Sequence, residues 1–207
     1  MKLGPVASGL IVGATAGALL MSPAHAAGDH WFGITAGASV PHGYFSDDAK
    51  TGTLIGFSYT RMLNGVVGVG ADVERHGWEA KSRVNDPAIA IYGPNSRYLL
   101  TAWQYMAHVM FIAPMFGHAA AHPYLIGGLG FYNPGFKLDT DLGRDSETSM
   151  DTGFHGGGGL LFPGPRGTTL DLFMDFHQYQ DRVHPKPAAW TCAGVRINWS
   201  VPQALEP

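Results

Sequence analysis

The residues best suited to chemistry are carboxylates, histidines and one arginine that recur at every second position of short segments. Side chains two apart lie on the same face of an extended strand, so each segment would present its polar groups together. Such a set could relay protons, ligate a metal ion or form a network of paired charges. Its members are Asp72, Glu74, His76, His108, His155, Asp171, Asp175, His177 and Arg196.

A structural network of paired polar groups is the role that the sequence favours for these side chains. Buried charges need ionic or hydrogen-bonding partners, and groups that share a narrow interior can supply them to one another. A metal site is the alternative, but no pair has the helical HxxxH or the CxxC spacing. We therefore expect no catalytic residue, no metal ligand and no cofactor. The predicted network consists of Asp72, Glu74, Asp171, Asp175, His177 and Arg196.

Three further motifs resemble chemical sites without completing one. The run His155-Gly156-Gly157-Gly158 resembles the oxyanion-hole loop of esterases, but the sequence has no GxSxG nucleophile motif. Cys192 is the single cysteine, which excludes an intrachain disulfide, and we expect it to fill space. The acidic segment 137–147 lacks the spacing of an EF-hand and predicts a solvated loop, with calcium or partner binding as the alternative.

The polar side chains need strands to position them, and apolar residues alternate with small or polar ones in eight segments. The segment 170–177 shows this best, since Leu172 and Met174 alternate with Asp171 and Asp175. The predicted strands are 30–40, 51–63, 66–78, 97–113, 122–132, 152–162, 168–179 and 189–201.

The connections between these strands alternate in length. Asn64-Gly65 is a strong hairpin signal because both residues accept positive φ. The segments 116–121 and 163–167 are also short, whereas 41–50, 79–96, 133–151 and 180–187 are longer. This rhythm is typical of an outer-membrane barrel, which has short periplasmic turns and long exterior loops.

The bulky apolar side chains fall on the strand face opposite the carboxylates. An eight-stranded barrel is so narrow that inward side chains fill it, and a soluble barrel would need bulky apolar groups there. The polar face is instead rich in glycine, which leaves room for larger inward groups. We therefore predict that the apolar face meets lipid. Aromatic residues near strand ends are predicted to form interfacial belts: Trp31, Tyr59, Trp78, Tyr98, Trp103, Tyr105, Tyr179 and Trp199.

The N-terminal segment has the pattern of a secretory leader. Lys2 is followed by the apolar stretch 10–21 and by Ala24-His25-Ala26 at the cleavage spacing. The sequence thus predicts a signal peptide at 1–27 and a barrel domain at 28–207. No later apolar run reaches about 18 residues, so no helical span is expected. The net charge of −3 gives no nucleic-acid footprint.

The leader end, the segment His122-Pro-Tyr-Leu-Ile-Gly-Gly-Leu-Gly-Phe-Tyr132 and the segment 153–162 resemble the small outer-membrane β-barrel family. This family includes the OmpA-type membrane domain and its porin-like relatives. The resemblance implies a location in the Gram-negative outer membrane, contact with its lipids and lipopolysaccharide, and insertion by the barrel-insertion machinery. Family members usually end on an aromatic residue, whereas this sequence ends with the segment 202–207, which has none.

The sequence therefore predicts an all-β protein, an eight-stranded antiparallel up-and-down transmembrane β-barrel that follows a cleavable signal peptide. Its favoured function is non-enzymatic, either structural or through a surface partner that binds the exterior loops 79–96 and 133–151. Three alternatives stay open. The first is a small pore for ions or solutes, and the second is an outer-membrane lipid-modifying enzyme, although no His-x-Ser pair supports it. The third, a soluble ligand-binding barrel, would need the apolar faces inside.

Overall fold

The computed structural model describes residues 29–114, 121–140, 143–181 and 185–201. The predicted signal peptide and the segment 202–207 lie outside these ranges. Two α-helices, α1 (Phe45–Asp48) and α2 (Ser82–Tyr92), and one 3-10 turn, η1 (Pro165–Gly167), interrupt the strands. The strands are β1 (His30–His42), β2 (Gly52–Met62), β3 (Val67–Glu79), β4 (Arg97–Ile112), β5 (His122–Thr140), β6 (Gly143–Thr148), β7 (Asp151–Pro163), β8 (Thr168–Tyr179) and β9 (Ala188–Val201).

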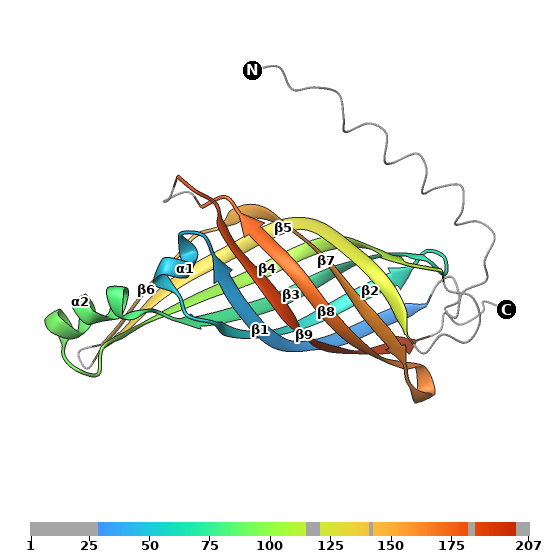
Figure 1. The fold of residues 1–207 in the computed structure, drawn as a ribbon, viewed down its shortest axis with the longest axis horizontal. Coiled ribbons are helices and arrows are strands. Elements are labelled where there is room, and N and C mark those ends of the chain that lie inside the picture. The colour runs from blue at the N-terminus through green and yellow to red at the C-terminus, as the bar shows by residue number, and fades with distance from the viewer. Residues whose placement is uncertain (1–28, 115–120, 141–142, 182–184, 202–207) are drawn as a thin grey trace, which may run out of the picture.

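Eight of these strands form a closed antiparallel barrel (Figure 1). Their order is β4-β3-β2-β1-β9-β8-β7-β5, and a β4–β5 pairing closes the ring. Every neighbour in this ring is antiparallel. β6 pairs only with the far end of β5 and therefore lies outside the ring. The predicted eight-stranded up-and-down barrel is confirmed, and each wall strand lies within a few residues of its predicted position except at the end of β5.

The two ends of the barrel differ. One end, called here the long-loop end, carries α1, α2 and the β5–β6 hairpin, and α2 and β6 project well past the wall (Figure 1). The opposite, short-turn end carries the 63–66 and 164–167 connections. The long connections thus lie at one end of the barrel and the short ones at the other, which is the arrangement typical of an outer-membrane barrel. Among the described residues, no helix is both long and apolar enough to span a bilayer.

The segment 133–151, predicted as a loop, instead contains ordered strand structure. β5 continues to Thr140 and pairs with β6, and Arg97 at the start of β4 pairs with Asp139 across the same extension. The sequence did not predict this hairpin because the segment 143–148 contains no apolar residue and Pro134 argues against a strand. The segment 79–96 likewise contains the helix α2.

The Asn64-Gly65 turn joins β2 and β3 as predicted, but its backbone differs from the expected one. Positive φ occurs among the described glycines at Gly43, Gly93 and Gly167, so Gly65 does not use it. The Asn64 Oδ1 atom instead accepts hydrogen bonds from the backbone N–H groups of Val66 and Val67, at 2.9 and 2.8 Å. Asparagine stabilises the turn here through its side chain.

The two faces of the wall follow the predicted alternation. Ile34, Leu129 and Met174 lie on the outside, with 57%, 71% and 61% of their surfaces exposed. The polar side chains at the intervening positions are buried, including Asp171 and His177. Side chains therefore fill the interior with polar groups, and the apolar groups form the outer wall, which is the arrangement a lipid environment favours.

The predicted aromatic belts are wrong for Trp31, Trp78 and Tyr179, which are buried in the interior. Their place in the alternation explains this, because each shares its strand face with inward polar residues. Trp103, Tyr105 and Trp199 do face outward. Proximity to a strand end was thus a weaker guide than the two-residue period.

Candidate functional site

Arg196 on β9 lies at the centre of the polar interior. Its Nη2 atom is 3.6 Å from Oε1 of Glu74, and its Nη1 atom is 3.6 Å from Oδ2 of Asp171. Its Nε donates a hydrogen bond of 2.9 Å to Oγ1 of Thr35. The guanidinium also lies 5.2 Å from the ring centre of Phe173, a cation–π distance. One buried cation therefore links strands β1, β3, β8 and β9.

The hydrogen bonds continue on both sides of Arg196. The Tyr124 hydroxyl donates to Oδ2 of Asp171 at 2.9 Å, and the Gln104 amide donates to the Glu74 carboxylate. His76 Nε2 lies 3.1 Å from Oε1 of Gln104. Because an amide oxygen can only accept, Nε2 of His76 is the donor. Each carboxylate that contacts Arg196 thus has a second partner.

Asp72 belongs to a separate group on β2, β3 and β4. Its Oδ2 atom accepts a hydrogen bond from Nδ1 of His108 at 2.6 Å. The other ring nitrogen of His108 lies 2.9 Å from Oγ1 of Thr60. A buried carboxylate oxygen, an imidazole and a hydroxyl are thus hydrogen-bonded in series, while Oδ1 of Asp72 has no hydrogen-bond partner among the described residues.

His155, Asp175 and His177 form a third group, on β7 and β8. One ligand atom from each of the three lies within 4.8 Å of the other two. The His155 and His177 rings stack with centroids 5.5 Å apart. All three side chains are buried.

Aromatic rings form a layer that covers these groups at the long-loop end. Trp190 is fully buried and contacts Trp78, Tyr132, Tyr179 and His177, with centroid distances of 5.3, 5.4, 5.8 and 5.5 Å. Phe45 of α1 packs edge-on against Trp78 at 5.0 Å. We call Phe45, Trp78, Tyr132, Tyr179 and Trp190 the aromatic layer.

Contacts among the long connections hold α1 over this layer. The Tyr44 hydroxyl donates a 2.6 Å hydrogen bond to Asp181, which ties the β1–β2 connection to the β8–β9 connection. Burial and this hydrogen bond raise the pKa of the Tyr44 hydroxyl. Arg83 of α2 donates to Asp48 of α1 at 2.6 Å, and this hydrogen bond raises the pKa of the Arg83 guanidinium.

The six residues of the predicted network are all buried, but the structure divides them among three groups. Glu74 and Asp171 each contact Arg196, Asp72 pairs with His108, and Asp175 and His177 lie beside His155. The sequence did not reveal the other partners: Thr35, Thr60, Gln104, Tyr124, Tyr132 and Trp190. The two-residue period of each strand places these residues on the inner face. Trp190, for example, lies on the same face of β9 as Cys192 and Arg196. Contacts across the barrel were not readable, because they depend on how the strands are staggered.

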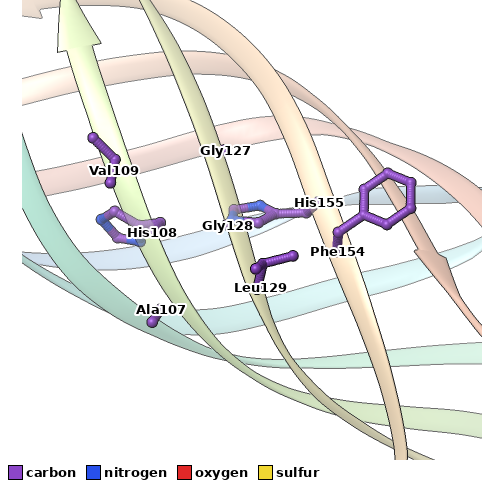
Figure 2. A pocket seen from close by; sticks show the side chains of 8 residues that line it. All are labelled: Ala107, His108, Val109, Gly127, Gly128, Leu129, Phe154 and His155. Atoms are coloured by element: carbon purple, nitrogen blue, oxygen red, sulfur yellow. The ribbon is translucent and has the colours of Figure 1, made fainter.

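The outer wall carries a shallow groove over β4, β5 and β7. Figure 2 shows Val109 on β4 and Phe154 on β7, with Gly127, Gly128 and Leu129 on β5 between them. The glycines lack side chains, so the groove lies where the wall is thinnest. Its exposed side chains are apolar, which suits an acyl chain of the surrounding lipid better than a polar substrate.

Solved structures similar to this chain include a surface protein, an attachment protein and an outer membrane protein. No protein-family model and no curated protein matches the chain. Neisserial surface protein A is similar with a TM-score of 0.55 and 12% identity, over 83% of this chain and 98% of that one. Ail of Yersinia pestis, in complex with the heparin analogue sucrose octasulfate, has a TM-score of 0.51 and 18% identity, over 83% of this chain and 99% of that one. A major outer membrane protein from Thermus thermophilus has a TM-score of 0.52 and 10% identity, over 83% of this chain and 99% of that one.

At these identities the likeness concerns the fold. The shared fold, the apolar outer wall and the polar interior give the chain the architecture of an outer-membrane β-barrel, as the sequence predicted.

Proposed function

We propose that this protein is a non-enzymatic outer-membrane barrel that binds a protein partner through its long-loop end. One observation carries the proposal. Helix α2 projects past the barrel wall and exposes Ile89, Ile91 and Tyr92, the second of them with 72% of its surface accessible. Exposed apolar and aromatic side chains on a projecting element are typical of a protein–protein contact. In the membrane the long-loop end would face the exterior and the short-turn end the periplasm.

The closed interior supports a structural role for the barrel itself. Paired polar groups fill its middle, and the aromatic layer covers them at the long-loop end. Large buried side chains also lie near the short-turn ends of their strands, among them Met62, Ile112 and Leu161. A pore would need an open path through these side chains. We therefore favour a scaffold for the loops over a channel.

A lipid-modifying enzyme is the second candidate, and one arrangement favours it. The Ser39 hydroxyl and the Cys192 thiol lie 3.3 and 3.6 Å from Nδ1 of His76, which resembles a nucleophile beside a base. His76 donates from Nε2 to Gln104, so Nδ1 is the nitrogen that would accept a proton. All three side chains have no exposed surface, so a lipid ester could not reach them without opening the barrel. The arrangement therefore serves the packed interior better than catalysis.

Adhesion of cells that display the chain tests the leading proposal. Cells with the unmodified protein should bind a surface coated with a panel of extracellular proteins, and the double variant Ile89→Asp/Ile91→Asp should reduce that binding several-fold. Tyr92→Phe, which keeps the apolar ring, serves as the matched control and should bind normally. Immobilised heparin belongs in the panel, because the Ail structure holds a heparin analogue. Equal adhesion of all variants, or binding to heparin alone, would contradict the proposal.

Two further measurements address the competing functions. Planar bilayers that contain the purified barrel should show no steady conductance, and stable channels would favour the pore. Mass spectra of lipid A from expressing cells should match those from control cells. A change in these spectra that Ser39→Ala abolishes would favour the enzyme.

N-terminal sequencing of the exported protein would test the proposed division into a signal peptide at 1–27 and a barrel at 28–207.

A further inference from the structure

We propose that His155, Asp175 and His177 bind one late first-row divalent metal ion, such as Zn²⁺, inside the barrel. This site is independent of the proposed surface function. Its three candidate donor atoms lie within 4.8 Å of one another, and all three side chains are at least nine-tenths buried.

Strand register places these donors together. His155 on β7 lies directly opposite His177 on β8, and Asp175 is two residues before His177 on the same inward face. Gly157 lies opposite Asp175, and a Cβ at Gly157 would meet Oδ1 of Asp175 and the backbone oxygen of Met174 at 2.1 and 2.2 Å. The glycine therefore leaves the space that the Asp175 carboxylate occupies.

Two of the three side chains present atoms that no protein group satisfies. Nε2 of His155 and Oδ1 of Asp175 are buried and have no hydrogen-bond partner among the described residues. An unsatisfied buried polar atom is costly. Both side chains belong to the same three-residue cluster, and a cation bound there would interact with the Asp175 carboxylate.

The hydrogen bonds of Tyr132 determine which nitrogen of His177 is free to bind a metal. The Tyr132 hydroxyl lies 3.1 Å from the backbone oxygen of Phe154 and 3.3 Å from Nδ1 of His177. The carbonyl can only accept, so the single hydroxyl proton goes to it and the tyrosine oxygen accepts from Nδ1–H. Nε2 of His177 then carries the lone pair. A protein oxygen that holds the second ring nitrogen is the usual support of a metal-bound histidine.

The charges of the interior also favour a cation. Arg196 contacts Glu74 and Asp171, and Asp72 pairs with His108, but no ion pair in the described part of the chain includes Asp175. A divalent ion at Asp175 would supply the directly bound positive partner that no ion pair of the described residues supplies there. The buried carboxyl groups of the described residues are Asp72, Glu74, Asp151, Asp171 and Asp175, against the one buried guanidinium of Arg196.

The donor types indicate the class of metal. Two imidazoles and one carboxylate suit Zn²⁺, Cu²⁺, Ni²⁺, Co²⁺ and Fe²⁺, whereas Ca²⁺ and Mg²⁺ prefer oxygen donors alone. The helical HxxxH and CxxC spacings used in the sequence analysis could not detect this site. Its histidines lie on two antiparallel strands, 22 positions apart in numbering (155 to 177), and only the barrel register brings them together.

The test uses the full barrel without an affinity tag, refolded in detergent and stripped of metal with a chelator. Zn²⁺ is titrated against a competing chelator, and the bound metal is counted by elemental analysis after desalting. We expect one Zn²⁺ per chain, with no comparable binding of Ca²⁺ or Mg²⁺. His155→Gln and Asp175→Asn should each weaken Zn²⁺ binding at least about tenfold.

Two controls separate this site from other effects. Asp175→Asn keeps the shape of the side chain and removes a buried charge, so the barrel should still fold, which heat-modifiable migration on a gel verifies. His42→Gln removes an exposed histidine outside the cluster and should leave Zn²⁺ binding unchanged. The proposal is overturned if the folded barrel binds no Zn²⁺, or if Asp175→Asn and His155→Gln bind it as tightly as the unmodified chain.

Discussion

The two faces of β8 share one backbone and differ completely in their surroundings. Asp171 and Asp175 are buried among other polar groups, while Leu172 and Met174 between them are exposed. In a soluble protein the apolar face would be the buried one. An exposed side chain on the wall of this barrel is therefore one that no protein atom covers, and lipid rather than water is expected to surround it. The same type of substitution should therefore change the free energy of unfolding by different amounts on the inner and outer faces.

Removal of the central cation should have the largest effect. Arg196→Leu leaves the Glu74 and Asp171 carboxylates buried without their ion pair, which costs about 3–5 kcal/mol of the free energy of unfolding. Arg75→Leu provides the matched control, because Arg75 lies on the exposed face of β3 and has no buried partner to lose. Urea unfolding in lipid vesicles measures both. An unchanged midpoint for Arg196→Leu would contradict a structural role for the network.

A charge on the outer face should be the next most costly change. Met174→Arg puts a guanidinium on the wall of β8 where lipid is expected, at a cost of about 2–4 kcal/mol near the bilayer midplane. Ile91→Arg, at an apolar residue of α2 that is even more exposed, should change the free energy of unfolding by less than about 0.5 kcal/mol. The same vesicle unfolding assay compares them. Equal effects of the two substitutions would show that the wall residue does not face lipid.

Alanine substitutions of glycines on the inner and outer faces should change the free energy of unfolding by different amounts, and this difference should be smaller than the two effects above. A Cβ at Gly157 meets Asp175 Oδ1 at 2.1 Å, whereas a Cβ at outward-facing Gly127 has only the His155 backbone oxygen nearby, at 3.8 Å. Gly157→Ala should therefore cost about 1–3 kcal/mol through overpacking, while Gly127→Ala should fold with little change. The difference between their urea midpoints is the measurement. Equal midpoints would mean that the interior can relax around an added methyl group.

The sequence predicted the wall of the barrel well because the two-residue period acts locally. Each strand shows its inward and outward residues without reference to its neighbours, which is why Asp171 and Arg196 could both be placed inside. It could not pair them, because a contact across the barrel depends on the stagger of all the strands. His155 and His177 illustrate the limit, since their proximity follows from the β7–β8 register.

The features near the long-loop end were harder to predict for a different physical reason. Trp78 and Tyr179 are amphipathic rings that suit either a lipid interface or a packed interior, so residue type alone misplaced them. β6 contains no apolar residue, and that strand of the β5–β6 hairpin therefore gave no periodic signal. Local patterns predict structure well only where one face of an element meets a different environment from the other.

Spin labels on the wall test the central claim most directly. Cysteines replace Leu172 and Leu129 on the outer face, and Ile91 on α2, in a Cys192→Ala background that removes the native thiol. Each labelled barrel is studied in lipid vesicles. We predict that labels at 172 and 129 collide more often with oxygen, which dissolves in the bilayer, than with a water-soluble nickel chelate, and that the label at 91 shows the reverse. Free access of the nickel chelate to the labels at 172 and 129 would contradict the assignment of the apolar face to lipid.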